Sequence, residues 1–168
     1  AQLHLGESYL QGLDRAELIL RTPGMKPYLP EFEAARAAGI PVTSEMELFF
    51  ELCPAPIYGV TGSDGKTTTT SVIAGMLEAA GRRVFLGGNI GRPLLPVVGE
   101  IRAEDAAVVE LSSFQLISKR RSPDVAVVTN LSPNHLDIHK DMQEYIDANK
   151  NIFLLQGAFS SSVLNLDN

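Results

Sequence analysis

One stretch, residues 55–81, restricts the possible folds of this chain more than any other. It runs from a short apolar segment, APIYGV, through the glycine-rich loop TGSDG into the helical pattern KTTTTSVIAGMLEAAG. Glycines let a backbone turn so that successive N–H groups converge on one anion, and the helix that follows directs its positive end at the same point. The stretch therefore predicts a phosphate-binding loop between a strand and a helix.

The loop also supplies the side chains that a nucleotide requires. Lys66 would neutralise the outer phosphates, and Thr67 would offer a hydroxyl to Mg²⁺. The strict phosphate-loop pattern needs glycine where Val60 stands, so the match is to the shorter G-x-x-G-K-T. An empty glycine-rich turn is the alternative, which the flanking strand and helix disfavour. We expect nucleotide contacts from the loop residues Gly62, Ser63, Asp64, Gly65, Lys66, Thr67 and Thr68.

Strand and helix patterns alternate along most of the chain. Further runs typical of strands are RRVFLGG, AAVVEL, DVAVVTN and SSVLNL, and the clearest later helix is DMQEYIDANKNIFLLQG. Continuous apolar runs indicate strands covered on both faces, as in parallel sheets. We therefore predict an α/β fold with a doubly wound, mostly parallel sheet. The prolines of ELCPAP mark the expected boundary between an N-terminal segment, residues 1–53, and a main domain, residues 54–168.

Polar motifs stand where the predicted strands end. GGNIG follows the apolar run RRVFL, ELSSFQ ends the strand after it, and NHLDIH follows DVAVVTN. In an open α/β sheet the loops beyond the carboxyl ends of the strands form the ligand crevice, so these motifs are expected to share one site. Glu110 closes an apolar strand, where a carboxylate is costly unless it is paired or binds a metal. Beside Lys66 and Thr67 we favour a Mg²⁺ role, with pairing to a neighbouring group as the alternative.

Three later residues carry weaker signals. His135 in isolation is more typical of a surface or capping histidine, and Asp137 of a residue that caps a turn. Lys150 lies on the flank of the apolar face of its helix, where a lysine ordinarily extends its charge to water. The chemistry of these side chains alone does not select them as site residues.

Composition argues against several classes of protein. The formal net charge of −6 disfavours binding to nucleic acid through charge. No apolar run approaches the roughly 20 residues of a membrane-spanning helix. Cys53 is the only cysteine, which indicates a reducing cytoplasm and no disulfide framework. The chain begins without methionine and ends on an apparent strand, so we expect an excerpt of a longer protein.

Five motifs together resemble the Mur ligases. TGSDGKTTT, GGNIG, ELSSFQL, NLSPNHLD and YIDANKNIF occur in the order and at the spacings of that family, and the resemblance spans nearly the whole chain. ELSSFQL beside GGNIG is most similar to the members that add D-glutamate. The resemblance implies a monomeric, cytoplasmic enzyme of peptidoglycan synthesis. It would use ATP to join D-glutamate to UDP-N-acetylmuramoyl-L-alanine through an acyl phosphate.

The resemblance also implies a domain plan. Residues 1–53 would be the end of a smaller, Rossmann-like domain that binds the UDP-substrate, and residues 54–168 an incomplete central ATP-binding domain. The C-terminal domain, which supplies the D-glutamate pocket in the family, would be absent. The segment alone is therefore expected to be inactive.

Single residues receive roles from the same resemblance. Lys66 would contact the β- and γ-phosphates, and Thr67 and Glu110 would hold one Mg²⁺. A second Mg²⁺ would be bound by His135 and supported by Lys150, which relatives carry as a carbamate. The implied catalytic residues are thus Lys66, His135 and Lys150. The implied contacts with UDP-N-acetylmuramoyl-L-alanine are Thr22, Pro23, Gly24, Asn89, Ser112 and Gln115.

Two positions depart from the family pattern, and two other functions stay open. Asp64 stands where the family often has asparagine, and Asn134 where many members have an acidic residue. G-x-x-G-K-T is shared with folylpolyglutamate synthase, which is the alternative enzyme. A non-catalytic nucleotide-binding module is the alternative of another class. It would need a water-positioning residue and a loop that senses the γ-phosphate, and the sequence shows neither clearly.

Overall fold

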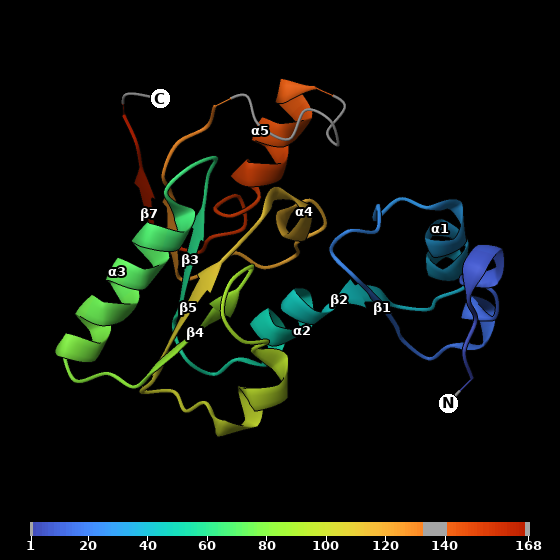
Figure 1. The fold of residues 1–168 in the computed structure, drawn as a ribbon, viewed down its shortest axis with the longest axis horizontal. Helices are drawn as coiled ribbons and strands as arrows, with labels where there is room; N and C mark the ends of the chain where they lie inside the picture. The colour runs from blue at the N-terminus through green and yellow to red at the C-terminus, as the bar shows by residue number, and fades with distance from the viewer. Residues whose placement is uncertain (1, 133–140, 167–168) are drawn as a thin grey trace. The chain divides into compact units, whose positions relative to one another are not determined.

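The computed structural model describes residues 2–132 and 141–166 of the chain. The chain forms two compact units, Ala1–Glu45 and Met46–Asn168 (Figure 1). Within the described ranges, no helix combines the length and the apolar character that crossing a membrane requires.

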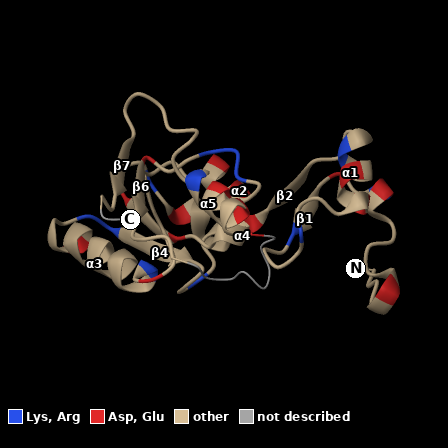
Figure 2. Cartoon of the chain, turned by 90° about the horizontal axis from the view of Figure 1, so that it is seen from above, with Lys and Arg blue, Asp and Glu red and all other residues tan. Residues whose placement is uncertain are grey.

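The first unit packs a helix against a pair of parallel strands. Its elements are, in chain order, η1 (Gly6–Ser8), η2 (Leu13–Arg15), β1 (Ile19–Arg21), α1 (Pro30–Ala37) and β2 (Val42–Ser44). Pro30 occupies the first turn of α1, where its missing N–H costs no helical hydrogen bond. Figure 2 shows acidic and basic residues together on α1, where Arg36 pairs with Glu33. The small core is formed by the apolar side chains Ile19, Phe32, Ala35 and Val42.

The second unit contains a five-stranded sheet. Its elements are, in chain order, α2 (Glu45–Leu52), β3 (Ile57–Thr61), α3 (Lys66–Ala79), β4 (Val84–Gly88), η3 (Leu95–Glu100), β5 (Ala106–Glu110), α4 (Ser113–Leu116), β6 (Val125–Val128), α5 (Met142–Lys150) and β7 (Ser161–Leu164). All strands are parallel, in the order β4-β5-β3-β6-β7. The central strand β3 therefore lies between two strands that follow it much later in the chain. The loop after β3 opens at this switch point, where ligands bind in open α/β sheets.

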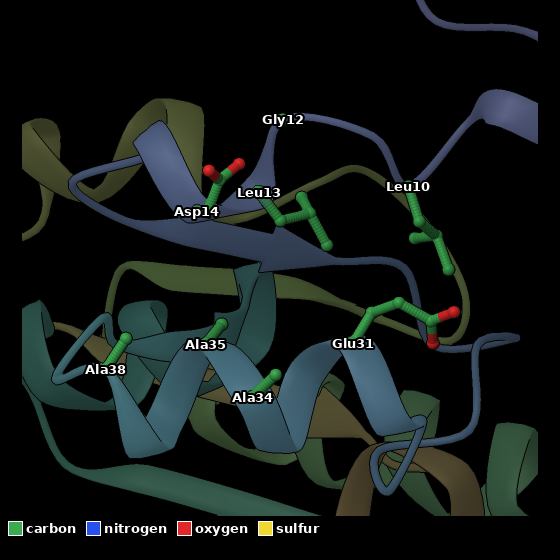
Figure 3. Close-up of a pocket in the computed structure, with 8 residues that line it drawn as sticks. All are labelled: Leu10, Gly12, Leu13, Asp14, Glu31, Ala34, Ala35 and Ala38. Carbon is green, nitrogen blue, oxygen red and sulfur yellow. The ribbon is translucent and has the colours of Figure 1, made fainter.

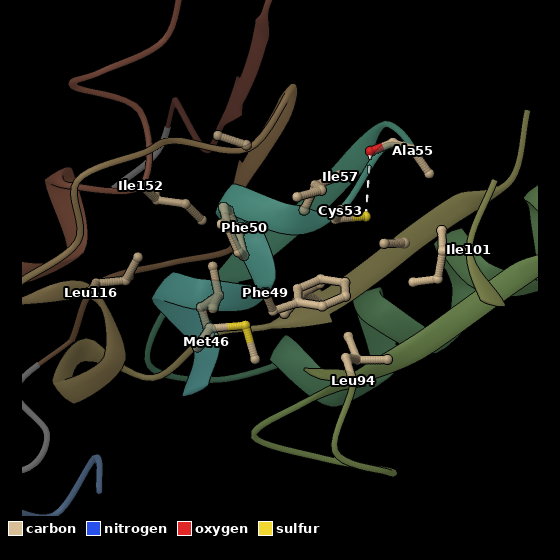
Figure 4. Packing of buried hydrophobic residues seen from close by; sticks show 14 residues of the cluster. Met46, Phe49, Phe50, Cys53, Ala55, Ile57, Leu94, Ile101, Leu116 and Ile152 are labelled. Carbon is tan, nitrogen blue, oxygen red and sulfur yellow. Dashed lines mark hydrogen bonds between the residues drawn. The ribbon is translucent and has the colours of Figure 1, made fainter. Parts of the chain in front are cut away.

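The core of the second unit explains why β5 is a continuous apolar run. Ala107 and Val109 join the buried cluster around Phe49 and Phe50 of α2 (Figure 4). Val108 points to the opposite face of the sheet and is equally buried. The helix α3 packs against β3, β4 and β5. A strand covered on both faces has no position for a polar side chain until it ends, at Glu110.

The predicted α/β class and the doubly wound parallel sheet are confirmed, and every predicted strand is present. The compact units divide between Glu45 and Met46, earlier than the boundary expected at residue 53. The reason is that Phe49 and Phe50 of α2 are fully buried in the core of the second unit. The assignment of residues 1–53 and 54–168 to different domains of a larger ligase stays a prediction.

Candidate active site

The glycine loop after β3 is shaped by two glycines with different constraints. Gly62 has a φ of 137°, and a Cβ there would overlap the Thr129 hydroxyl and lie 2.8 Å from the Asn130 carbonyl oxygen. Gly65, with a φ of 78°, has open space around it and precedes the first residue of α3. Among the described residues no side chain caps α3 at Gly65. The N–H groups of this first helical turn are thus left to an external acceptor.

Lys66 closes the loop on itself. Its Nζ donates to the carbonyl oxygens of Gly62 at 2.7 Å and Ser63 at 3.0 Å. The ammonium therefore lies inside the turn of the loop. Both contacts are to neutral carbonyl oxygens. A charged phosphate oxygen would attract the Lys66 ammonium more strongly. The position suits an ammonium that turns to an incoming phosphate.

Glu110, the last residue of β5, accepts hydrogen bonds from a side chain of α3 and from one that follows β4. The side chain is only 2% exposed, yet Thr67 Oγ1 donates to Oε2 at 2.7 Å and Asn89 Nδ2 donates to Oε1 at 2.9 Å. The Asn89 backbone N–H also donates to the Glu110 carbonyl oxygen at 2.8 Å. Pairing with neighbours thus accounts for the buried carboxylate. The structure brings together three predicted site residues: Thr67, Asn89 and Glu110.

The oxygen atoms of Thr67 and Glu110 fit one hard divalent cation. Mg²⁺ takes few protein oxygens and completes its octahedron with water and phosphate. Across the described part of the chain, no group of three His, Cys, Asp or Glu side chains could hold a metal ion by itself.

The end of β6 contributes two residues that the sequence analysis did not select. Asn130 receives hydrogen bonds from two loop N–H groups, Ser63 N at 2.9 Å through its carbonyl and Asp64 N at 2.8 Å through Oδ1. Thr129 Oγ1 donates to the Asp64 carbonyl oxygen at 2.6 Å. The signal was present in the sequence, because VVTN ends a strand as ELSS does. These contacts brace the glycine loop from the neighbouring strand.

Ser112 and Gln115 have a local structural task. Gln115 Oε1 accepts from the Ser112 backbone N–H at 2.9 Å, while Ser112 Oγ accepts from the Gln115 N–H at 3.3 Å. This reciprocal capping box starts the short helix α4 directly after β5. The spacing S-x-x-Q is its sequence signature, and the sequence analysis did not use it. A contact of either residue with a muramoyl substrate stays a prediction.

Lys150 ends α5 with its charge on the surface. Its Nζ lies 3.3 Å from Asp147 Oδ1. Hydrogen bonds from Gln143 and from Lys150 hold the pKa of the Asp147 carboxyl below its usual value. An unmodified ammonium does not bind a cation, so the predicted metal role of Lys150 depends on the carbamate. His135 and Asp137 lie outside the described residues.

The remaining predicted contacts, Thr22, Pro23 and Gly24, belong to the first unit and follow β1 as an exposed loop. The same unit has a largely apolar cavity of about 240 Å³ (Figure 3). None of the predicted site residues lines it. Its walls are formed by Leu10, Gly12, Leu13, Asp14, Glu31, Ala34, Ala35 and Ala38.

The glycine loop and the buried Glu110 lie in the part of the chain that matches a known family. Residues 60–168 match the model of the Mur ligase middle domain. The chain belongs to the Mur ligase family. The predicted resemblance to the Mur ligases is thereby confirmed.

Two curated relatives of this Mur ligase chain share the name UDP-N-acetylmuramoylalanine–D-glutamate ligase. The protein of Acetivibrio thermocellus is 58% identical over 164 residues, which are 98% of this chain and 35% of the relative. The protein of Clostridium kluyveri is 55% identical over 166 residues, 99% of this chain and 36% of the relative. The chain thus spans about a third of the length of the curated relatives it matches.

Solved Mur ligases share the fold. The MurF ligase of Thermotoga maritima, solved in complex with ADP, superposes with a TM-score of 0.59 at 24% identity, over 73% of this chain and 30% of that one. The UDP-N-acetylmuramate:L-alanyl-gamma-D-glutamyl-meso-diaminopimelate ligase of Neisseria meningitides gives a TM-score of 0.57 at 20% identity, over 92% of this chain and 53% of that one. At these identities the likeness shows the fold alone.

Proposed function

We propose that this chain is the nucleotide-binding part of a ligase that uses ATP to add D-glutamate to UDP-N-acetylmuramoyl-L-alanine in the cytoplasm. One observation carries the proposal: the Lys66–Thr67 loop and the buried Glu110 share one edge of the sheet, in a chain 58% identical to a ligase of that name. The ADP in the related MurF structure supports the choice of nucleotide.

The reaction needs an activated carboxylate. A carboxylate and an amine at neutral pH form a salt, because the carboxylate oxygen is a poor leaving group. A carboxylate oxygen of the muramoyl-alanine would attack the γ-phosphorus of ATP, giving an acyl phosphate and ADP. The amine nitrogen of D-glutamate would then attack the acyl carbon, lose a proton and expel inorganic phosphate. The enzyme contributes mainly positioning and charge neutralisation.

The residues at the strand ends suit these tasks. On nucleotide binding, Lys66 would exchange the Gly62 and Ser63 carbonyls for phosphate oxygens, and the uncapped start of α3 would donate its N–H groups. Thr67 and Glu110 would hold Mg²⁺, which supplies positive charge to the phosphates when bound. Asn89 would keep the Glu110 carboxylate in place and reach the muramoyl-alanine from the end of β4.

The second metal and the substrate contacts complete the proposal. His135 and a carbamate on Lys150 would support a second Mg²⁺ near the acyl phosphate. Ser112 and Gln115 would contact the muramoyl-alanine beside the capping box, and the loop of Thr22, Pro23 and Gly24 would contact the UDP end. The ligase would act as a monomer, with ATP, UDP-N-acetylmuramoyl-L-alanine and D-glutamate as its substrates.

A phosphate-release assay on the intact protein tests this function. We expect release from ATP only when UDP-N-acetylmuramoyl-L-alanine and D-glutamate are both present, because the acyl phosphate needs the first and its turnover the second. Release with folate and L-glutamate instead would identify the folylpolyglutamate synthase reaction. Stoichiometric nucleotide binding without turnover would identify a non-catalytic module and overturn the proposal.

A further inference from the structure

The helix α5 contacts the residues on both sides of Gly62, where the glycine loop begins. Before Gly62, Thr61 Oγ1 donates to Asn149 Oδ1 at 2.7 Å. After it, the Tyr145 hydroxyl lies 3.0 Å from Ser63 Oγ. All four side chains belong to buried residues, and Tyr145 and Asn149 share a helix face because they are four residues apart. One face of α5 is therefore hydrogen-bonded to the start of the loop.

Ser63 is held by contacts of both its hydroxyl and its backbone. Its Oγ accepts from the Ser132 N–H at 2.8 Å and donates to the Ser132 carbonyl oxygen at 3.0 Å. The hydrogen of the Ser63 hydroxyl is thereby used, so the Tyr145 hydroxyl is the donor of the contact between them. The Ser63 backbone N–H donates to the Asn130 carbonyl oxygen at 2.9 Å. The position of Ser63 thus depends on the end of β6 and on α5 together.

The ammonium of Lys66 depends on the same part of the loop. It donates to the carbonyl oxygens of Gly62 at 2.7 Å and Ser63 at 3.0 Å. The Tyr145 hydroxyl, Ser63 and the Lys66 ammonium therefore form one continuous chain of contacts. A shift of Ser63 would move one of the two oxygens that hold the ammonium. The conformation of the loop before a nucleotide binds is thus tied to α5.

We propose that Tyr145 and Asn149 are positioning residues of the glycine loop, which hold it in the conformation that binds the phosphates of ATP. Neither residue touches the nucleotide, because Tyr145 acts through Ser63 and Asn149 through Thr61. A loop that is ordered in advance binds its ligand more tightly, since binding then carries less of the entropic cost of ordering it. This inference rests on the proposed nucleotide-binding function of the loop.

Calorimetric titration of the intact protein with ATP·Mg²⁺ tests the inference. Tyr145→Phe removes only a hydroxyl, while the ring stays in the core. We expect its affinity for ATP·Mg²⁺ to fall about threefold to tenfold, the usual effect of one buried hydrogen bond, and its affinity for UDP-N-acetylmuramoyl-L-alanine to stay within about twofold. Asn149→Ala should show the same pattern. Urea unfolding checks that each variant is folded under the conditions of the titration.

A control variant and a double variant separate positioning from a general loss of stability. Asn151→Ala is the matched control, since its amide joins the same end of α5 to the Leu116 carbonyl oxygen at 3.1 Å and not to the loop. It should keep both affinities. Ser63→Ala removes the acceptor of the tyrosine hydroxyl, so adding Tyr145→Phe to it should weaken ATP·Mg²⁺ binding little further.

Three outcomes would overturn the positioning role. They are an unchanged ATP·Mg²⁺ affinity in Tyr145→Phe and Asn149→Ala, an equal loss in Asn151→Ala, and additive losses in the double variant. A parent protein that does not bind ATP·Mg²⁺ has a different meaning, because it would refute the proposed nucleotide-binding function and remove the basis of the inference.

Discussion

Two buried charged side chains of the second unit have opposite surroundings. Glu110 lies at the loop edge of the sheet, where Thr67 and Asn89 donate to both of its oxygens. Lys119 follows α4, is 7% exposed and has no hydrogen-bond partner for Nζ among the described residues. Its Nζ instead lies 2.9 Å from the centre of the Phe50 ring.

The comparison shows that burying a charge has different consequences at Glu110 and at Lys119. At the loop edge, polar atoms of Thr67, Asn89 and Asn130 make hydrogen bonds to Glu110 and to the glycine loop. At Lys119, burial lowers the pKa of the ammonium well below its usual value, with attraction from Glu47 and repulsion from Arg121 as smaller effects. The buried charge of the first region is compensated by hydrogen bonds, whereas that of the second carries a cost in stability.

The largest effect is expected when the Lys66 ammonium is removed from the loop edge of the sheet. In the intact protein Lys66→Ala should lower turnover about 10³-fold or more, because the developing phosphate charge loses its nearest cation. The fold should stay intact, since the two lost hydrogen bonds are local to the loop. Phosphate release measures the first effect and circular dichroism the second. Turnover near that of the parent protein would refute the phosphate role of Lys66.

Alanine at the two loop glycines compares a crowded with an open position. Gly62→Ala should weaken ATP binding and destabilise the protein by roughly 1–3 kcal/mol or more, because the new methyl meets Thr129 and Asn130. Gly65→Ala is the comparison, with a φ of 78° close to the left-handed region that other residues can adopt and free space around it. Calorimetry with ATP·Mg²⁺ and urea unfolding give the two readouts. Equal losses would mean that contact with β6 does not shape the loop.

The smallest effect is expected at Lys119, whose Nζ has no hydrogen-bond partner among the described residues. The pKa of Lys119 is lower in the folded than in the unfolded chain, so between that lowered value and about 10.4 the unfolded chain binds more protons. Stability should therefore rise with pH across this window. Lys119→Met should abolish that rise and increase the melting temperature at neutral pH by about a few degrees, since no charge remains to be desolvated.

Melting curves from neutral to alkaline pH, with exposed Lys26→Met as the control, measure this effect. An unchanged pH dependence in Lys119→Met would show that the amine is not desolvated. A loss of stability at neutral pH would show that its contact with Phe50 outweighs the cost of burial.

The sequence predicted the loop edge more completely than the rest of the site. Lys66, Thr67, Asn89 and Glu110 follow parallel strands at their carboxyl ends, and such ends meet at one edge in any doubly wound sheet. Thr129 and Asn130 obey the same rule and could have been predicted from it. The partners of Asn149 could not, because a contact between a helix and the end of a strand 88 residues away depends on how the helix packs.

The burial of Lys119 was equally invisible in the sequence. The run SKRR is typical of an exposed basic turn, and only the neighbouring α2 places an aromatic ring against its lysine. The capping box of Ser112 and Gln115 is a different case, since its spacing was present and local. Local hydrogen bonds follow from spacing, whereas burial follows from packing.

The sequence by itself determined the class of fold, the glycine loop between a strand and a helix, and the carboxylate beside it. Each depends on short-range patterns: glycines that permit a turn, apolar runs that must be covered and a polar residue at a strand end. Only the tertiary structure decided which side chains brace that loop and which charge is left without a hydrogen bond. Those contacts join segments far apart in the chain, and only the packing of one element against another brings their atoms within hydrogen-bonding distance.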